Sequence, residues 1–166
     1  IPWSEESNTA GIRFGEAVSD AGDVDGDGYD DIIYGTYRDD FGFTDAGSIG
    51  IYRGLANKTL QYTWTTNGTQ ANENFGYSVS SAGDVNKDGY DDILIGSLQY
   101  TNDQATEGRT FLYYGSSSWL TFGTETAWTG EGSQATAQYG RSVASAGDVN
   151  GDGYADMMVG SILWSN

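Results

Sequence analysis

Three nine-residue stretches of this sequence, residues 23–31, 84–92 and 148–156, place oxygen-bearing side chains at the same positions. Asp or Asn stands at positions 1, 3, 5 and 9 of every stretch, and Gly stands at position 6. Calcium takes about six to eight oxygen ligands at roughly 2.3–2.6 Å, and a chain that turns sharply at Gly can direct alternate side chains toward one ion. Asp, Asn and Gly are also common in ordinary acidic turns. The three copies in one register favour calcium loops over ordinary turns.

Positions 7 and 8 of the stretches fit the same interpretation. Position 7 is Tyr each time, and it would supply its backbone carbonyl while its side chain packs elsewhere. Position 8 is Asp30, Asp91 and Ala155, so a position that is not expected to bind the ion does not keep an oxygen-bearing side chain.

The loops are not EF-hands, which are flanked by helices and end in a Glu at position 12. Position 12 here is Tyr34, Ile95 or Val159. Each loop is followed instead by a short apolar run that ends in Gly, which is typical of a buried strand. We therefore expect each loop to be the turn of a β-hairpin.

Composition narrows the possible functions. The chain of 166 residues has a formal net charge of −17, which argues against binding to nucleic acid or to an anionic membrane. It contains no Cys and no His, which excludes disulfides, Ser-His-Asp triads and His-ligated zinc. No run of about 18 apolar residues is present to span a membrane. Metal ions could stabilise such a chain outside the cell in place of disulfides.

Internal repeats organise the whole chain. In three copies a Trp precedes an aromatic-Gly pair by eleven residues, and that pair precedes the first loop Asp by nine. The Trp residues are Trp3, Trp64 and Trp128, and the pairs begin at Phe14, Phe75 and Tyr139. We interpret residues 1–166 as one continuous array. It comprises an outer strand and connector (1–13), repeat 1 (14–74), repeat 2 (75–138) and a partial repeat 3 (139–166).

Each full repeat contains four predicted strands. They cover residues 14–19, 32–35, 48–54 and 61–64 in repeat 1, and residues 75–81, 93–96, 109–115 and 126–128 in repeat 2. Four short strands in about 60 residues predict an all-β fold of four-stranded antiparallel β-propeller blades, about two and three-quarter of them. A parallel β-helix is the alternative, but its repeats are shorter.

The aromatic-Gly pairs and the Asp-x-Asp/Asn-x-Asp-Gly-x-x-Asp loops resemble the FG-GAP repeats of integrin α-subunit propellers and their microbial relatives. The chain departs from the GAP element, because Gly35, Gly96 and Gly160 are followed by neither Ala nor Pro. The resemblance implies one Ca²⁺ ion in the first hairpin of each blade, three in all. The ligands it implies are Asp23, Asp25, Asp27, Tyr29 and Asp31; Asp84, Asn86, Asp88, Tyr90 and Asp92; and Asp148, Asn150, Asp152, Tyr154 and Asp156.

The resulting expectation is a non-catalytic, calcium-binding module at the cell surface or outside the cell. It would serve adhesion, ligand binding or surface architecture, with a protein or glycan as partner. An enzyme is disfavoured because the Asp residues are assigned to metal and the Glu residues form no repeated pattern. Asn57 and Asn67 begin N-glycosylation sequons on either side of the expected outer strand.

Two other functions stay open. The partial blade could belong to a larger propeller, or it could be completed by neighbouring copies in a homo-oligomer or an extracellular filament. Alternatively, exposed aromatic side chains could bind carbohydrate, although packing between blades is the favoured role for them. The aromatic candidates are Trp3, Tyr37, Phe41, Phe43, Tyr100 and Trp119.

Overall fold

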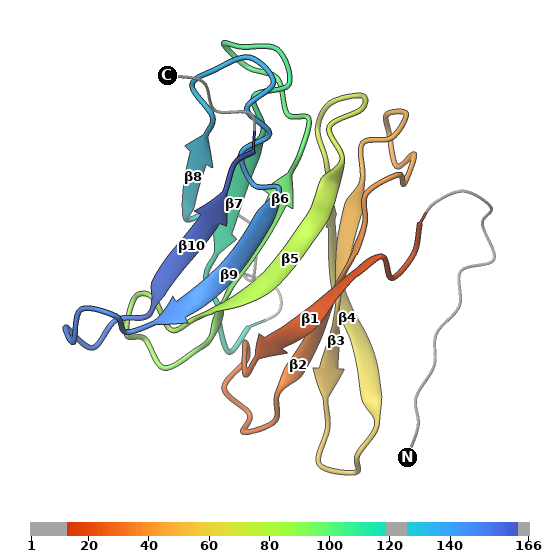
Figure 1. Ribbon diagram of the computed structural model, residues 1–166. Coiled ribbons are helices and arrows are strands. Elements are labelled where there is room, and N and C mark those ends of the chain that lie inside the picture. Colours follow the sequence, from red (N-terminus) through yellow and green to blue (C-terminus); the bar gives the residue numbers. More distant parts are fainter. Residues whose placement is uncertain (1–12, 119–125, 163–166) are drawn as a thin grey trace.

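The computed structural model describes residues 13–118 and 126–162, which form strands and no helix (Figure 1). Residues 1–12 of the expected outer strand and connector, with Trp3, and the candidate Trp119 lie outside the described residues. The strands are β1 (Ala17–Gly22), β2 (Asp31–Thr36), β3 (Ser48–Gly54), β4 (Leu60–Asn67), β5 (Phe75–Gly83), β6 (Asp92–Ser97), β7 (Arg109–Tyr113), β8 (Trp128–Glu131), β9 (Ser142–Gly147) and β10 (Asp156–Gly160).

The strands form three successive antiparallel sheets. Two sheets have four strands each, in the orders β1-β2-β3-β4 and β5-β6-β7-β8, and the third is the hairpin β9-β10. The sheets stand side by side, with β5 against β1 on one side and against β9 on the other. The three loops of interest join β1 to β2, β5 to β6 and β9 to β10, at the same end of the array (Figure 1). The all-β blade architecture and the place of the loops in the first hairpins are confirmed.

Several strand boundaries differ from the expected ones, and two of the differences concern where a strand begins. β1 begins at Ala17 rather than at residue 14, because Arg13 and Gly15 have positive φ and the Glu16 N–H donates to the Arg13 carbonyl in a turn. β8 lies two residues later than expected, because its pairing with β7 runs from Trp128 opposite Leu112 to Glu131 opposite Arg109.

A β-bulge precedes each loop and turns the chain into it. The pairing register shifts before Gly22, Gly83 and Gly147, whose φ angles are 75°, 71° and 67°. Such angles are readily adopted by Gly. The Gly22 N–H donates to Asp20 Oδ1 at 2.7 Å. In the other repeats the N–H groups of Gly83 and Gly147 donate to the hydroxyl oxygens of Ser81 and Ser145, at 3.0 and 3.2 Å.

Paired glycines bring neighbouring blades into backbone contact. A Cβ atom on Gly35 would overlap the Gly76 carbonyl oxygen, and one on Gly96 would overlap the Gly140 carbonyl oxygen. Gly76 and Gly140, the glycines of the second and third aromatic-Gly pairs, therefore pack against the Gly near the end of the second strand of the preceding blade. This contact leaves no room for a side chain at Gly35 or Gly96, and Gly76 and Gly140 also have positive φ angles, of 80° and 81°, which favour Gly.

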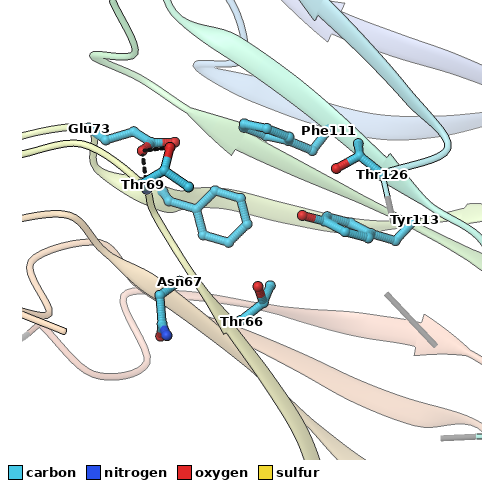
Figure 2. Close-up of a pocket in the computed structure, with 8 residues that line it drawn as sticks. Thr66, Asn67, Thr69, Glu73, Phe111, Tyr113 and Thr126 are labelled. Atoms are coloured by element: carbon cyan, nitrogen blue, oxygen red, sulfur yellow. Dashed lines mark hydrogen bonds between the residues drawn. The ribbon is translucent and has the colours of Figure 1, made fainter. Parts of the chain in front are cut away.

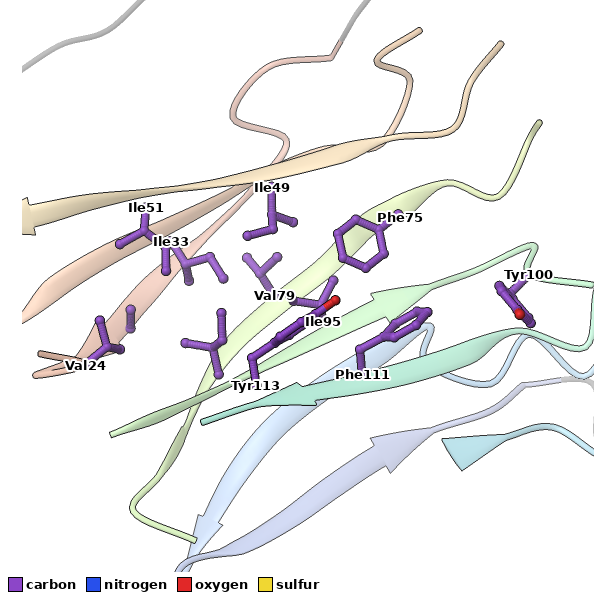
Figure 3. Packing of buried hydrophobic residues seen from close by; sticks show 12 residues of the cluster. Val24, Ile33, Ile49, Ile51, Phe75, Val79, Ile95, Tyr100, Phe111 and Tyr113 are labelled. Atoms are coloured by element: carbon purple, nitrogen blue, oxygen red, sulfur yellow. The ribbon is translucent and has the colours of Figure 1, made fainter. Parts of the chain in front are cut away.

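The core fills the space between the first two blades (Figure 3). Ile33, Ile49 and Ile51 of the first blade face the second blade, where Phe75 and Phe111 pack edge to face with ring centroids 5.2 Å apart. Every residue of β6 is buried, as its apolar sequence predicts. By contrast, Met158 of the two-stranded third sheet is 56% exposed. Burial of each large aliphatic side chain stabilises the fold by about 1.5–3 kcal/mol, so the blade interface is a principal source of stability.

Candidate calcium-binding loops

The first loop gathers three carboxylates. Ligand oxygens of Asp23, Asp25 and Asp27 all lie within 4.8 Å of one another. Two oxygens bound to one calcium ion can be up to about 5 Å apart, since each is roughly 2.3–2.6 Å from the ion. The arrangement therefore fits a calcium ion, with positions 1, 3 and 5 of the loop brought together as predicted.

Hydrogen bonds within the loop fix these carboxylates. The Asp27 N–H donates to Asp23 Oδ1 at 3.0 Å and to Asp25 Oδ1 at 3.1 Å. The Gly28 N–H donates to Asp23 Oδ2 at 2.8 Å, and the Tyr29 N–H donates to Asp27 Oδ1 at 3.0 Å. Side-chain oxygens at positions 1, 3 and 5 are thus held on the inner side of the turn.

The second and third loops repeat this geometry. Asp84 accepts from the backbone N–H groups of Asp88 and Gly89 at 3.1 and 2.9 Å. Asp148 accepts from those of Asp152 and Gly153 at 3.0 and 2.7 Å. Asn86 and Asn150 accept from the same N–H groups at position 5, at 2.9 and 2.8 Å. The position-6 glycines Gly28, Gly89 and Gly153 have φ angles of 90°, 90° and 84°, which a β-branched residue adopts only with strain.

The position-9 carboxylates lie apart from this cluster. Asp31 is 1% exposed and accepts from the Val24 N–H at 3.1 Å and the Gly54 N–H at 2.9 Å, so it joins the loop to the end of β3. Asp92 makes the equivalent pair of bonds with Val85 and Gly115, both at 2.9 Å. In the third loop, Asp156 accepts from the Val149 N–H at 2.9 Å. The sequence pattern marks position 9 as a ligand, and the structure adds a bracing role for it.

Burial changes the acidity of the bracing carboxylates. It raises the pKa of Asp31 to about 7 and the pKa of Asp92 to about 6, against the lowering effect of their backbone hydrogen bonds. A cation held at the loop would favour the ionised form of both groups.

Successive loops touch one another through position 7. A Cβ atom on Gly26 would lie 2.6 Å from the ring of Tyr90, so this ring packs on the preceding loop. Lys87 Nζ lies 4.0 Å from the centroid of the Tyr154 ring and donates to the Asp152 carbonyl at 2.7 Å. The position-7 side chains Tyr90 and Tyr154 therefore pack between neighbouring loops, and the three candidate sites form one connected row.

Sequence reasoning missed Arg53. Its Nε lies 2.5 Å from Asp25 Oδ2, and its Nη2 lies 2.7 Å from Asp27 Oδ2. Aligning the two repeats at their Phe-Gly pairs could have singled it out, because Arg53 then stands where repeat 2 has Tyr114. Only the repeat with Arg53 has Asp rather than Asn at position 3 of its loop.

The two sequons differ in setting. Asn57 lies in the exposed β3–β4 turn, where its Oδ1 accepts from the N–H and the hydroxyl of Thr59 at 3.1 and 2.6 Å. Asn67 is half-buried at the end of β4 and is followed by the buried Gly68, whose N–H donates to the Gly47 carbonyl at 2.8 Å. Asn57 is the more accessible acceptor.

The aromatic candidates for a carbohydrate surface are not all exposed. Tyr100 is 9% exposed and lies under the Arg109 guanidinium, 3.7 Å from the ring centroid. Tyr37 packs edge to face on Tyr77 of the next blade, with ring centroids 5.2 Å apart. Phe41 and Phe43 remain exposed, at 64% and 50%. The expectation of exposed rings is therefore wrong for Tyr100, which packs in the core.

A cavity of about 200 Å³ lies between the first two blades (Figure 2). It includes the buried Glu73, whose Oε2 accepts from the N–H groups of Thr69 and Gln70 at 2.6 and 2.9 Å. Glu73 Oε1 accepts from the Ser97 hydroxyl at 3.0 Å. These bonds give the carboxylate a structural role in joining the β4–β5 connection to β6.

In the part of the chain that the structure describes, no helix has the length and apolarity needed to cross a bilayer.

Comparison with known proteins agrees with the blade and loop geometry. The family model described as FG-GAP repeat matches residues 14–52, 75–113 and 139–161. The chain is 35% identical to integrin alpha-PS2 of Drosophila melanogaster over 84% of its length, and 35% identical to integrin alpha pat-2 of Caenorhabditis elegans over the same share. Integrin alpha-8 of Gallus gallus is 30% identical over 85% of the chain. The matched regions are 10%, 12% and 13% of these relatives, so the chain spans about a tenth of their length. Since the three matched segments cover more than half of its residues, the chain belongs to the FG-GAP repeat family.

Proposed function

We propose that this chain is a non-catalytic, calcium-binding repeat module that works at the cell surface or outside the cell, in adhesion or in binding a protein ligand. The observation that carries the proposal is the recurrence of one oxygen-lined loop at the same hairpin of three successive blades. The integrin alpha relatives support the adhesive context.

Each loop would hold one Ca²⁺ ion through the oxygens at positions 1, 3 and 5, the position-7 carbonyl and the position-9 carboxylate. Ten Asp side chains occupy positions 1, 3, 5 and 9 of the three loops. The ion would supply positive charge that offsets repulsion among these groups and would cross-link the turn. The protein's part is to hold the oxygens in place through hydrogen bonds from the backbone N–H groups of each loop.

The row of loops lies along one end of the blades, and its metal content would therefore control the rigidity of that end. An adhesive surface built on rigid blades loses less conformational entropy when it binds a partner. Adhesion would then depend on calcium, because removing the ions would loosen the hairpins at this end of the blades.

Two measurements test the proposal. Isothermal titration calorimetry should give about three calcium ions per chain, and a variant with Asp27→Asn, Asp88→Asn and Asp152→Asn should bind far fewer. Asn keeps an oxygen that can accept the position-7 N–H, so the substitution removes charge with little change of turn geometry.

Adhesion is tested separately. Beads coated with the chain should bind purified extracellular-matrix proteins in calcium and not in chelator, with the triple Asn variant as control. Binding to a glycan array in place of the proteins would identify a lectin instead. Calcium-independent capture of both classes would contradict the proposed function.

A further inference from the structure

The first loop, unlike the second, has an arginine among its carboxylates. Arg53 lies next to the end of β3, and its side chain is 29% exposed. Its guanidinium reaches Asp25, whose side chain is 3% exposed, at 2.5 Å, and Asp27, whose side chain is 21% exposed, at 2.7 Å. Arg53 is therefore a cation that already lies within the candidate metal site.

The guanidinium contacts particular oxygens of the loop. Asp25 Oδ1 and Asp27 Oδ1 accept backbone N–H groups, whereas Arg53 contacts the Oδ2 atom of each carboxylate. Metal ligation at positions 3 and 5 draws on these same two carboxylates. Full calcium ligation and both arginine contacts therefore compete for the same groups.

The second loop serves as an internal comparison. It has Asn86 at position 3, and the Asn86 side-chain amide donates to Asp88 Oδ2 at 2.8 Å. This neutral donor satisfies the position-5 oxygen that Arg53 satisfies in the first loop. Tyr114, 42% exposed, occupies the place of Arg53 in repeat 2. The extra carboxylate and the arginine thus occur together in repeat 1, and both are absent from repeat 2.

Electrostatic charge explains why the extra carboxylate and Arg53 occur together in repeat 1. Positions 1, 3 and 5 carry three negative charges in the first loop and two in the second. With Arg53 counted, the net charge of this first-loop cluster equals that of positions 1, 3 and 5 in the second loop, where Lys87 reaches toward the third loop instead. A third carboxylate in a partly buried cluster would otherwise destabilise the metal-free loop by like-charge repulsion.

We propose that Arg53 is a built-in counter-ion of the first loop, which stabilises the loop without metal and weakens its affinity for calcium. The inference rests on the proposed calcium binding of the three loops. Its consequence is that the loop with the most carboxylates is not the tightest site, because calcium must displace the guanidinium from at least one of them. Charge-assisted hydrogen bonds are among the stronger hydrogen bonds in proteins, so removing Arg53 should tighten calcium binding at this loop by roughly tenfold.

The experiment needs a signal from each loop separately. Labelling glycine with ¹⁵N provides one, because Gly28, Gly89 and Gly153 occupy position 6 of the three loops and their N–H groups donate to the position-1 carboxylates. Calcium is titrated into the 166-residue chain and into Arg53→Tyr, which introduces the residue of repeat 2. Arg53→Lys retains the positive charge but cannot contact both carboxylates as the planar guanidinium does. Tyr114→Arg adds a cation beside the second loop.

We expect the Gly28 midpoint of Arg53→Tyr to move to about tenfold lower calcium, while those of Gly89 and Gly153 stay within about twofold. In Arg53→Lys the Gly28 midpoint should move less. Arg53→Tyr should also lower the melting temperature of the metal-free chain, because the arginine contacts are lost. Tyr114→Arg should raise the Gly89 midpoint.

Two outcomes would overturn the proposal and are distinguishable from each other. If Gly28 keeps its midpoint or shifts to higher calcium in both Arg53 variants, Arg53 has no competing role, while the titrations of Gly89 and Gly153 leave the proposed function standing. If no glycine signal responds to calcium in any chain, the calcium function itself fails and the inference fails with it.

Discussion

Asp91 and Asp23 are joined by two hydrogen bonds across the boundary between the first two blades. The Asp91 N–H donates to the Asp23 carbonyl at 3.1 Å, and the Asp23 N–H donates to Asp91 Oδ2 at 2.9 Å. Burial raises the pKa of Asp91 despite this bond. At the next boundary Ala155 donates its N–H to the Asp84 carbonyl at 3.1 Å but has no carboxylate to return the second bond. Position 8, which the sequence pattern leaves without a ligand role, therefore connects one loop to the next.

Replacing Asp91 by Ala, the residue found at position 8 of the third loop, should lower the free energy of unfolding by about 1 kcal/mol through loss of this bond. Chemical denaturation in saturating calcium would measure the difference. The matched control is Asp30→Ala at the exposed position 8 of the first loop, which should change stability by less than about 0.5 kcal/mol. Equal losses in the two variants would contradict a specific connection between the loops.

Positions 5 and 9 of the second loop should respond differently to loss of charge. The two oxygens of Asp92 each accept one backbone N–H, from Val85 and from Gly115, so Asp92→Asn turns one of these acceptors into an NH₂ group that faces an N–H donor. The unmatched buried donors should cost about 1–3 kcal/mol even in chelator. Asp88→Asn at the exposed position 5 should weaken calcium binding and leave metal-free stability nearly unchanged.

Thermal melts of both variants, with calcium and with chelator, separate the two effects. The bracing role of position 9 would be refuted if Asp92→Asn melted like the parent chain in chelator.

The repeat pattern allowed the hairpin, the loop and its glycine to be predicted, because these depend on neighbours within nine residues. Gly28, Gly89 and Gly153 have the positive φ that the pattern requires. Aligning the repeats singles out Arg53, but its contact with Asp27 could not be predicted from one loop, since it spans 26 residues and depends on where β3 ends relative to the loop. The Asp91 connection spans 68 residues and two blades. Contacts between blades are set by packing, which the pattern within one repeat does not contain.

Gly89→Val should damage the second loop more than Lys87→Gly. Gly89 has a φ of 90°, and although a Cβ atom there would meet no atom within 4 Å, a β-branched residue at that angle costs about 1–3 kcal/mol of backbone strain. Lys87 also has a positive φ, of 62°, so Gly relieves strain at that position and removes only the contacts with Asp152 and Tyr154. Calorimetry on both variants measures calcium binding at the loop. Equal losses of affinity would count against the proposed loop geometry.

Removal of calcium should destabilise the whole array. Extracellular calcium modules bind with dissociation constants of roughly 10⁻⁴–10⁻³ M, so about 10 mM calcium is some 10–100 times that value. Binding at this excess stabilises the folded chain by about 1.4–2.7 kcal/mol per site, and three sites should raise the melting temperature by many degrees. Scanning calorimetry in calcium and in chelator measures the shift.

Sodium chloride of equal ionic strength is the control for screening of the −17 net charge. Magnesium is the control for ion size, because it demands shorter octahedral bonds than these loops are expected to give. A melting temperature that rises equally in all three salts would mean that screening, and not bound calcium, stabilises the blades.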